Sequence, residues 1–215
     1  ALFNDGVEIH TTEHLLASCF CIGITNLLVE ISGPEVPGMD GSALCFYQAL
    51  KEAEIDEQKE NSSYINIPKE FEVKEGNACI KATKNENGLK LEYRLDYGVP
   101  YIEKQNILFE ITEEIFEKEL APARTFALKQ EVDALLKAGL GKGANLQNTL
   151  VIDETGNIIE NKLRFSDEFA RHKMLDLIGD IALVGTKVNG YIIAERSGHT
   201  LNTLLVKELS NQITN

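Results

Sequence analysis

Residues 167–184 read DEFARHKMLDLIGDIALV and predict a long amphipathic helix. At about 100° per residue, His172, Asp176 and Asp180 lie at about 0°, 40° and 80°, so they form one narrow polar stripe. The opposite side of the helix carries apolar side chains, among them Met174 and Ile178. Two interpretations are open. The stripe is either the solvated face of an ordinary amphipathic helix or a histidine–carboxylate pair of metal-ligand type.

Two further histidines lie far from this helix in the sequence. His14 belongs to a helix that Thr11 or Thr12 can cap and that runs to about Ile22, with Gly23 as its stop. His199 follows a Ser-Gly pair at the start of a predicted helix over 198–209. Two imidazoles and a carboxylate can hold one zinc ion and leave a coordination position open. Each residue also has an ordinary explanation, since Glu13 and His14 suit the first turn of any helix.

The remaining sequence indicates strands and helices without strict alternation, which favours an α+β fold. Strands are expected at 26–31, 64–67, 78–83, 90–95, 106–111, 150–152, 158–160 and 189–194, with a hairpin turn at 85–88. Helices are expected at 42–53, 113–120 and 129–138. The polar stretch 54–63 is the best candidate linker. It predicts a first subdomain over residues 1–60 and a second over 61–215.

Composition excludes several classes of protein. The 215 residues are 43% hydrophobic and 26% charged, as in a globular protein with a core. A net charge of −13 argues against a broad nucleic-acid interface, which needs clustered lysine and arginine. The four cysteines indicate reduced thiols in a cytoplasmic protein. No apolar run approaches the roughly 20 residues of a membrane span, and acidic residues interrupt the opening segment where a signal peptide would be apolar.

Five blocks of sequence are more informative together than singly: Thr12–Ala17 (TEHLLA), Gly33–Ala43 (GPEVPGMDGSA), Ala123–Phe126 (ARTF), Arg171–Asp180 (RHKMLDLIGD) and Ser197–Asn202 (SGHTLN). In order and spacing they closely resemble the zinc-dependent UDP-3-O-acyl-N-acetylglucosamine deacetylases of lipid A synthesis. The resemblance covers essentially the whole chain. It implies a sandwich of two subdomains in which helices pack between two mainly antiparallel sheets.

The resemblance also implies the chemistry of a site. His14, His172 and Asp176 would hold Zn²⁺, and Glu13 would be the general base for the attacking water. Three residues are implied around the reacting acetamide. Thr125 would donate to the developing oxyanion. His199 would be the acid, and Asp180 would keep it protonated. Lys173 would flank the metal and meet substrate phosphate.

Further residues are implied to contact the substrate. Tyr97 would stack on the uracil base and Asp96 would bond its edge, although a strand end with an exposed aromatic would look the same. Arg196 would meet the pyrophosphate. The segment from Phe126 to Asn145, with Leu135, Leu136 and Leu140, resembles the insert that wraps the acyl chain; its alternative is an ordinary leucine-packed helix. Val99 stands where the family usually has a histidine.

One departure from the family is large, because the strands that open the first subdomain are absent before the block of Glu13 and His14. We therefore expect either a fragment or a second polypeptide that supplies those strands. Two other functions stay open. One is a zinc hydrolase for a different acetamide or acyl-nucleotide, and the other is an incomplete, non-catalytic subunit for binding or assembly.

Overall fold

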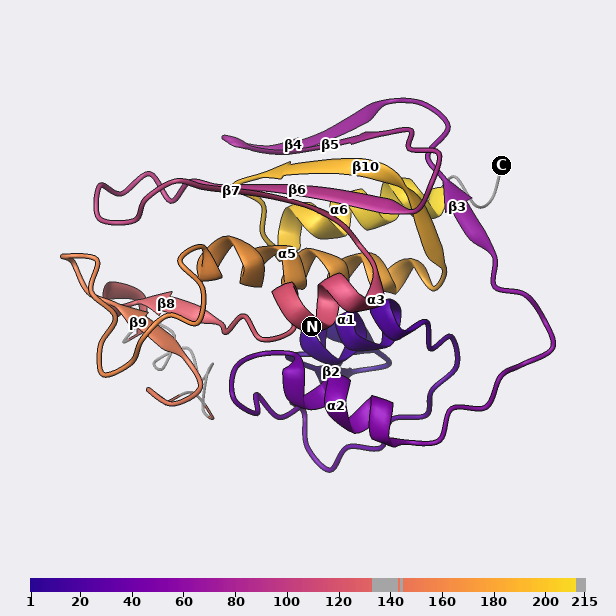
Figure 1. The fold of residues 1–215 in the computed structure, drawn as a ribbon, viewed down its shortest axis with the longest axis horizontal. Coiled ribbons are helices and arrows are strands. Elements are labelled where there is room, and N and C mark those ends of the chain that lie inside the picture. Colours follow the sequence, from indigo (N-terminus) through magenta and orange to yellow (C-terminus); the bar gives the residue numbers. More distant parts are fainter. Residues whose placement is uncertain (133–142, 144, 212–215) are drawn as a thin grey trace.

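The long helix predicted from residues 167–184 lies at the centre of the molecule. The computed structural model describes residues 1–132, 143 and 145–211 (Figure 1). Helix α5 (Glu168–Ile181) continues into a short 3₁₀ turn, η2 (Ala182–Val184). All residues of α5 are buried except Arg171 and Lys173. The polar stripe is therefore inside the protein, and its interpretation as a solvated face is wrong.

A six-stranded mixed sheet covers one side of the helices. Its order is β4-β5-β10-β6-β7, and β3 pairs with the start of β10. β10 is parallel to β6 and to β3, whereas the other neighbours are antiparallel. The strands span Tyr64–Asn66 (β3), Phe71–Glu75 (β4), Ala78–Thr83 (β5), Leu89–Leu95 (β6), Gln105–Glu110 (β7) and Lys187–Glu195 (β10).

Burial alternates along the central strand β10, as expected for a sheet with one face on the core. Val188, Gly190, Ile192 and Ala194 are the buried positions. Gly190 allows tight packing there, because a Cβ would lie 2.3 Å from Cδ1 of Ile67, whose side chain would have to move. Strand β10 and Ile67, the residue after β3, therefore pack closely at this point.

The helices form layers on the buried side of this sheet (Figure 1). α5 contacts β6, and α6 (His199–Asn211) contacts α5, β4 and β5. α1 (Glu13–Ile22) packs on α5 and on α2 (Leu44–Glu52). α1 ends as predicted at Gly23, whose left-handed backbone places its N–H on the carbonyl of Cys19.

Shorter elements complete the described chain. β1 (Leu2–Asn4) and β2 (Val7–Ile9) form an antiparallel pair, and β8 (Phe126–Leu128) is parallel to β9 (Leu150–Ile152). α3 (Glu113–Ile115) runs into a π-helical turn, η1 (Phe116–Leu120). Among the described residues, no helix combines the length and apolar character needed to cross a bilayer.

The α+β fold class is confirmed, and most predicted elements form within a residue or two. The strand predicted at 158–160 is wrong, because only an isolated bridge between Ile158 and Ile152 forms there. The strand predicted over 26–31 is wrong: this segment has no strand partner, and Leu27, Leu28 and Val29 are exposed. An apolar pattern cannot make a strand without a neighbour that accepts its backbone hydrogen bonds. The predictions also missed β1, β2, β4 and β8. Most of the helix predicted at 129–138, with Leu135, Leu136 and Leu140, lies outside the described residues.

Residues 54–63 contain no helix or strand and are exposed, as expected for a linker. The division of the chain into subdomains at residue 60 stays a prediction.

Candidate active site

The start of α1 brings two of the sequence blocks together. The backbone of His10 pairs with the loop over 33–38, donating to Pro34 and accepting from Val36. Thr11 has a left-handed backbone, with φ of 56°, and its hydroxyl donates to the carboxylate of Glu35 at 2.9 Å. These contacts fix the direction in which the chain enters α1. As a result, His14 is buried in the first turn, and Glu13 beside it is half-buried.

Close packing of α1 on α5 places this first turn beside the polar stripe. Gly179 of α5 lies directly under Glu13, since a Cβ at residue 179 would lie 2.2 Å from the Glu13 carbonyl oxygen. Only glycine allows this approach of one helix backbone to another. The crossing delivers His14 to the level of His172, and their ring centroids are 5.1 Å apart.

His14, His172 and Asp176 form a buried cluster. Each offers one ligand atom, and these atoms all lie within 4.8 Å of one another. Oδ1 of Asp176 is 3.3 Å from Nε2 of His172 and 3.7 Å from Nε2 of His14. Exposure of the three residues is only 3–4%. The structure thus brings together the three residues predicted as metal ligands.

The environment of His172 suits a neutral ligand. Its Nδ1 lies 3.1 Å from the carbonyl oxygen of Ala123, which selects the tautomer with a free lone pair on Nε2. Burial lowers the pKa of His172 to about 4, so the ring is uncharged at neutral pH. Nδ1 of His14 is buried and has no hydrogen-bond partner in the described part of the chain. Nε2 of His14, on the other side of the ring, is the nitrogen that lies toward Asp176 and is available to the cluster.

Asp176 also serves a neighbouring cation. Nζ of Lys173 donates to its Oδ2 at 2.8 Å. Burial opposes ionisation of Asp176, but His172 and Lys173 together hold its pKa well below the usual range. Burial likewise opposes the charged lysine, yet Asp176 raises the pKa of Lys173. The pair therefore stays ionised, with one carboxylate oxygen toward the histidines and the other toward the lysine.

His199 occupies a different setting from the other two histidines. Its Nδ1 is 2.8 Å from Oδ2 of Asp180, and Nδ2 of Asn202 donates to the same oxygen at 2.7 Å. The hydrogen bond to Asp180 raises the pKa of His199 to about 9. Ligand atoms of His199, Glu13 and Asp176 also lie within 4.8 Å of one another. A protonated imidazole therefore stands beside the histidine–aspartate cluster.

Thr125 and Phe126 lie close in sequence to Ala123, whose carbonyl bonds His172. The backbone of Thr125 donates to Gly41 and accepts from Leu150, which anchors it between a loop and the start of β9. The ring of Phe126 lies 6.3 Å from His172 and 5.6 Å from Tyr97, measured between ring centroids. Phe126 thus connects the cluster to the segment predicted for uracil.

Asp96, Tyr97, Lys173 and Arg196 line a pocket of about 340 Å³ with Tyr93, Leu95, Ser197 and Gly198. Asp96 already has three partners: Arg196 and Lys104 form ion pairs with it, the latter at 3.0 Å, and the Gly98 N–H donates to it at 2.9 Å. The sequence analysis missed these partners, and only Arg196 lies far from Asp96 along the chain, 100 residues away. Cationic side chains at one pocket suit an anionic ligand.

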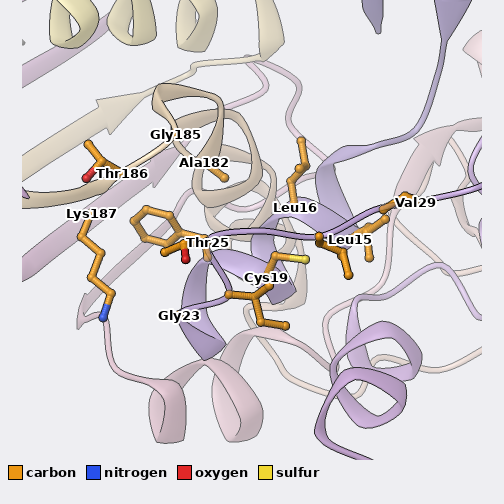
Figure 2. Close-up of a pocket in the computed structure, with 13 residues that line it drawn as sticks. Leu15, Leu16, Cys19, Gly23, Thr25, Val29, Ala182, Gly185, Thr186 and Lys187 are labelled. Carbon is orange, nitrogen blue, oxygen red and sulfur yellow. The ribbon is translucent and has the colours of Figure 1, made fainter. Parts of the chain in front are cut away.

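A second pocket, of about 240 Å³, lies along α1 and the segment that follows it (Figure 2). Its walls are mainly apolar and include Leu15, Leu16 and Cys19 of α1, together with Val29 and Ala182. None of the predicted site residues lines it. This pocket is therefore separate from the predicted site.

Comparison with known proteins agrees with the arrangement of the site. Residues 1–211 match the family model described as UDP-3-O-acyl N-acetylglycosamine deacetylase. Among similar proteins, the UDP-3-O-acyl-N-acetylglucosamine deacetylase of Thermodesulfovibrio yellowstonii is 42% identical over 205 residues, which are 95% of this chain and 70% of the relative. Proteins of the same name from Nautilia profundicola and Brucella ovis are 40% and 41% identical. They cover 97% and 96% of this chain, which spans 71% and 72% of their lengths. The chain therefore belongs to the UDP-3-O-acyl N-acetylglycosamine deacetylase family.

Proposed function

We propose that this protein is a zinc-dependent deacetylase that hydrolyses the acetamide of UDP-3-O-acyl-N-acetylglucosamine. The observation that carries the proposal is the buried cluster of His14, His172 and Asp176 beside a protonated His199. Two neutral imidazoles and a carboxylate are a common ligand set for catalytic zinc. The printed names of the relatives support the choice of substrate.

When bound, zinc would polarise the acetamide carbonyl and lower the pKa of a water molecule. Glu13, half-buried at the edge of the cluster, would take a proton from the attacking water. The hydroxyl of Thr125 would donate to the oxygen on which negative charge develops. His199 would give its proton to the departing amine, so acetate and a free amino sugar result. Asp180 would hold the imidazolium in place through the 2.8 Å contact with Nδ1.

The pocket that contains Tyr97 and Arg196 is our proposed site for the nucleotide. Lys173 and Arg196 would meet the phosphates, and Tyr97 would stack on the base. Asp96 would then orient Arg196 through their ion pair as well as reaching the uracil edge. Phe126, between Tyr97 and His172, would separate the nucleotide end from the reacting end.

The metal assignment is tested by zinc analysis of the purified chain and of His172→Ala. We expect about one zinc ion per chain in the parent, as for a single mononuclear site. The variant should bind zinc much more weakly and lose deacetylase activity. His10→Gln is a control, because His10 pairs with Glu8 and is no part of the cluster. Unchanged zinc content and activity in His172→Ala would show that the ligand assignment is wrong.

The substrate assignment is tested by comparing UDP-N-acetylglucosamine with and without a 3-O-acyl chain. We expect much faster turnover of the acylated substrate. Equal rates would favour a zinc hydrolase for another acetamide. Binding of zinc with no turnover of either compound would instead favour a non-catalytic subunit.

We further propose that the reaction serves lipid A biosynthesis in the cytoplasm. All four cysteines are free thiols, which supports a reducing compartment. Measuring deacetylase activity and lipid A in cells depleted of this protein tests that proposal. Unchanged lipid A after depletion would contradict it.

A further inference from the structure

The carbonyl of Ala123 bonds His172 of α5. The next residue, Arg124, attaches the same segment to α5 at a second point, Glu168, which lies outside the five sequence blocks. Glu168, one helical turn before His172, is completely buried. Its Oε1 accepts from the backbone N–H of Arg124 at 3.1 Å and from Nε of Arg124 at 2.9 Å. Its Oε2 accepts from Nη2 of Arg124 at 3.3 Å and from the backbone of Arg164. One carboxylate thus holds both the main chain and the side chain of Arg124.

Arg124 uses the rest of its guanidinium on the loop that precedes α5. Nη1 donates to Oδ1 of Asn161 at 3.0 Å, and Nη2 donates to the carbonyl of Lys162 at 2.6 Å. The residue is only 5% exposed. A planar, branched group can make these contacts at once, whereas a lysine ammonium cannot. The pair therefore joins the segment before β8, the loop and α5.

The two attachments on α5 are four residues apart and act on adjacent residues. Glu168 holds Arg124, and His172 bonds the carbonyl of Ala123. Positions i and i+4 share one face of a helix, so the segment is held at two points along that face. Such a clamp determines both the position of the Ala123 carbonyl and the position of Thr125, the next residue after Arg124.

We infer that Arg124 and Glu168 are positioning residues for the metal ligand His172. The inference rests on the proposed zinc site. By holding the Ala123 carbonyl against Nδ1, the pair keeps the His172 ring in the orientation and tautomer that present Nε2 to the cluster. Partners of this kind usually change metal affinity by about 10- to 100-fold when they are lost.

The test measures zinc affinity of the full chain by competition with a chelator. Glu168→Gln keeps the shape of the side chain and removes its charge. We expect its zinc affinity to fall by about 10- to 100-fold. The visible spectrum of the cobalt-substituted chain should also change, because that spectrum reports ligand geometry. Thermal unfolding establishes that the variant is folded at the temperature used.

Glu92→Gln is the matched control. Glu92 is also a buried glutamate, 8% exposed, and accepts from Nε of Arg94 at 2.7 Å. Its partners Arg94 and Tyr191 lie on the strands of the main sheet, and within the described part of the chain neither is hydrogen-bonded to His14, His172 or Asp176. We expect Glu92→Gln to lose stability while keeping parental zinc affinity and cobalt spectrum. A general loss of stability is thereby separated from a specific effect on His172.

Asn161→Ala is a milder second variant, which loosens the guanidinium without leaving a buried charge unpaired. It should weaken zinc binding by about threefold or more, through Arg124 and the Ala123 carbonyl that bonds His172. If Glu168→Gln does not fold, Asn161→Ala decides the question alone. Parental zinc affinity in the folded variants would overturn the inference. Absence of zinc binding by the parent would instead overturn the proposed function on which it rests.

Discussion

At the scale of single residues, the histidines differ because their surroundings stabilise opposite protonation states. His172 is 3% exposed, and burial lowers its pKa to about 4. His199 is exposed to solvent and bonded to Asp180, which raises its pKa to about 9. A metal ligand must be neutral and a general acid must be protonated. The two environments therefore suit two roles within one site.

Activity is expected to depend on pH through His199. The protonated acid predominates below a pH of about 9 and is lost above it, so kcat/KM should fall as the pH rises through that value. Asp180→Asn removes the charge that favours the imidazolium. We expect the basic limb of the profile to move toward the ordinary histidine pKa of about 6.5. The measurement is kcat/KM against pH at saturating zinc.

The control for this experiment is His10→Gln, which should leave the profile unchanged because His10 lies outside the site. A basic limb in Asp180→Asn at the parental pH would contradict the assignment of His199 as the acid.

At the scale of elements, the site depends on how closely α1 crosses α5. The first turn of α1 carries Glu13 and His14, and α5 carries His172 and Asp176. The two helices meet at Gly179, where the Glu13 backbone occupies the space of a missing side chain. A small change in this separation would move the general base relative to all the ligands on α5.

Gly179→Ala should therefore disturb both stability and the site. The added methyl group must displace the Glu13 backbone, and overpacking of this kind costs about 1–3 kcal/mol. We expect a lower free energy of unfolding in urea and weaker zinc binding by the folded variant. Gly38→Ala is the control, since a Cβ there meets no atom within 4 Å. Parental values for both quantities in Gly179→Ala would contradict the close crossing.

At the scale of the whole molecule, the proposed metal would join parts of the chain that are far apart in sequence. His14 comes from the N-terminal helix, whereas His172 and Asp176 come from the central helix of the fold. The folded chain alone assembles these ligands, so zinc should bind it in preference to the unfolded chain. Metal binding then adds directly to the free energy of unfolding.

Zinc at 100 times its dissociation constant should stabilise the protein by about 2.7 kcal/mol. The free energy of unfolding, measured with free zinc held at that ratio and again with a chelator, gives this difference. The increment should disappear in Asp176→Asn and persist in His10→Gln. An equal increment in Asp176→Asn would place the stabilising metal elsewhere.

Local patterns in the sequence were sufficient to predict many of the helices and strands of this protein. Apolar periodicity predicted α1, α5 and α6, and Gly23 predicted the end of α1, because such signals act over one or two turns. The predicted threonine cap of α1 is wrong, since Thr12 makes no capping hydrogen bond and Thr11 donates to Glu35. Five separated blocks predicted the family, and the three proposed ligands in them lie together in the fold. The same patterns failed for residues 26–31, where a strand depends on a neighbour and not on its own side chains.

Tertiary structure alone decided what surrounds the predicted residues. The helical wheel was equally compatible with a solvent-exposed and a buried stripe of His172, Asp176 and Asp180. Packing of α5 against α1 and α6 buries it. The partners of His172 and of Glu168, Ala123 and Arg124, lie 49 and 44 residues away in sequence. Contacts across such distances depend on how whole elements pack, so the sequence determined which residues are present, and the fold determined which of them meet.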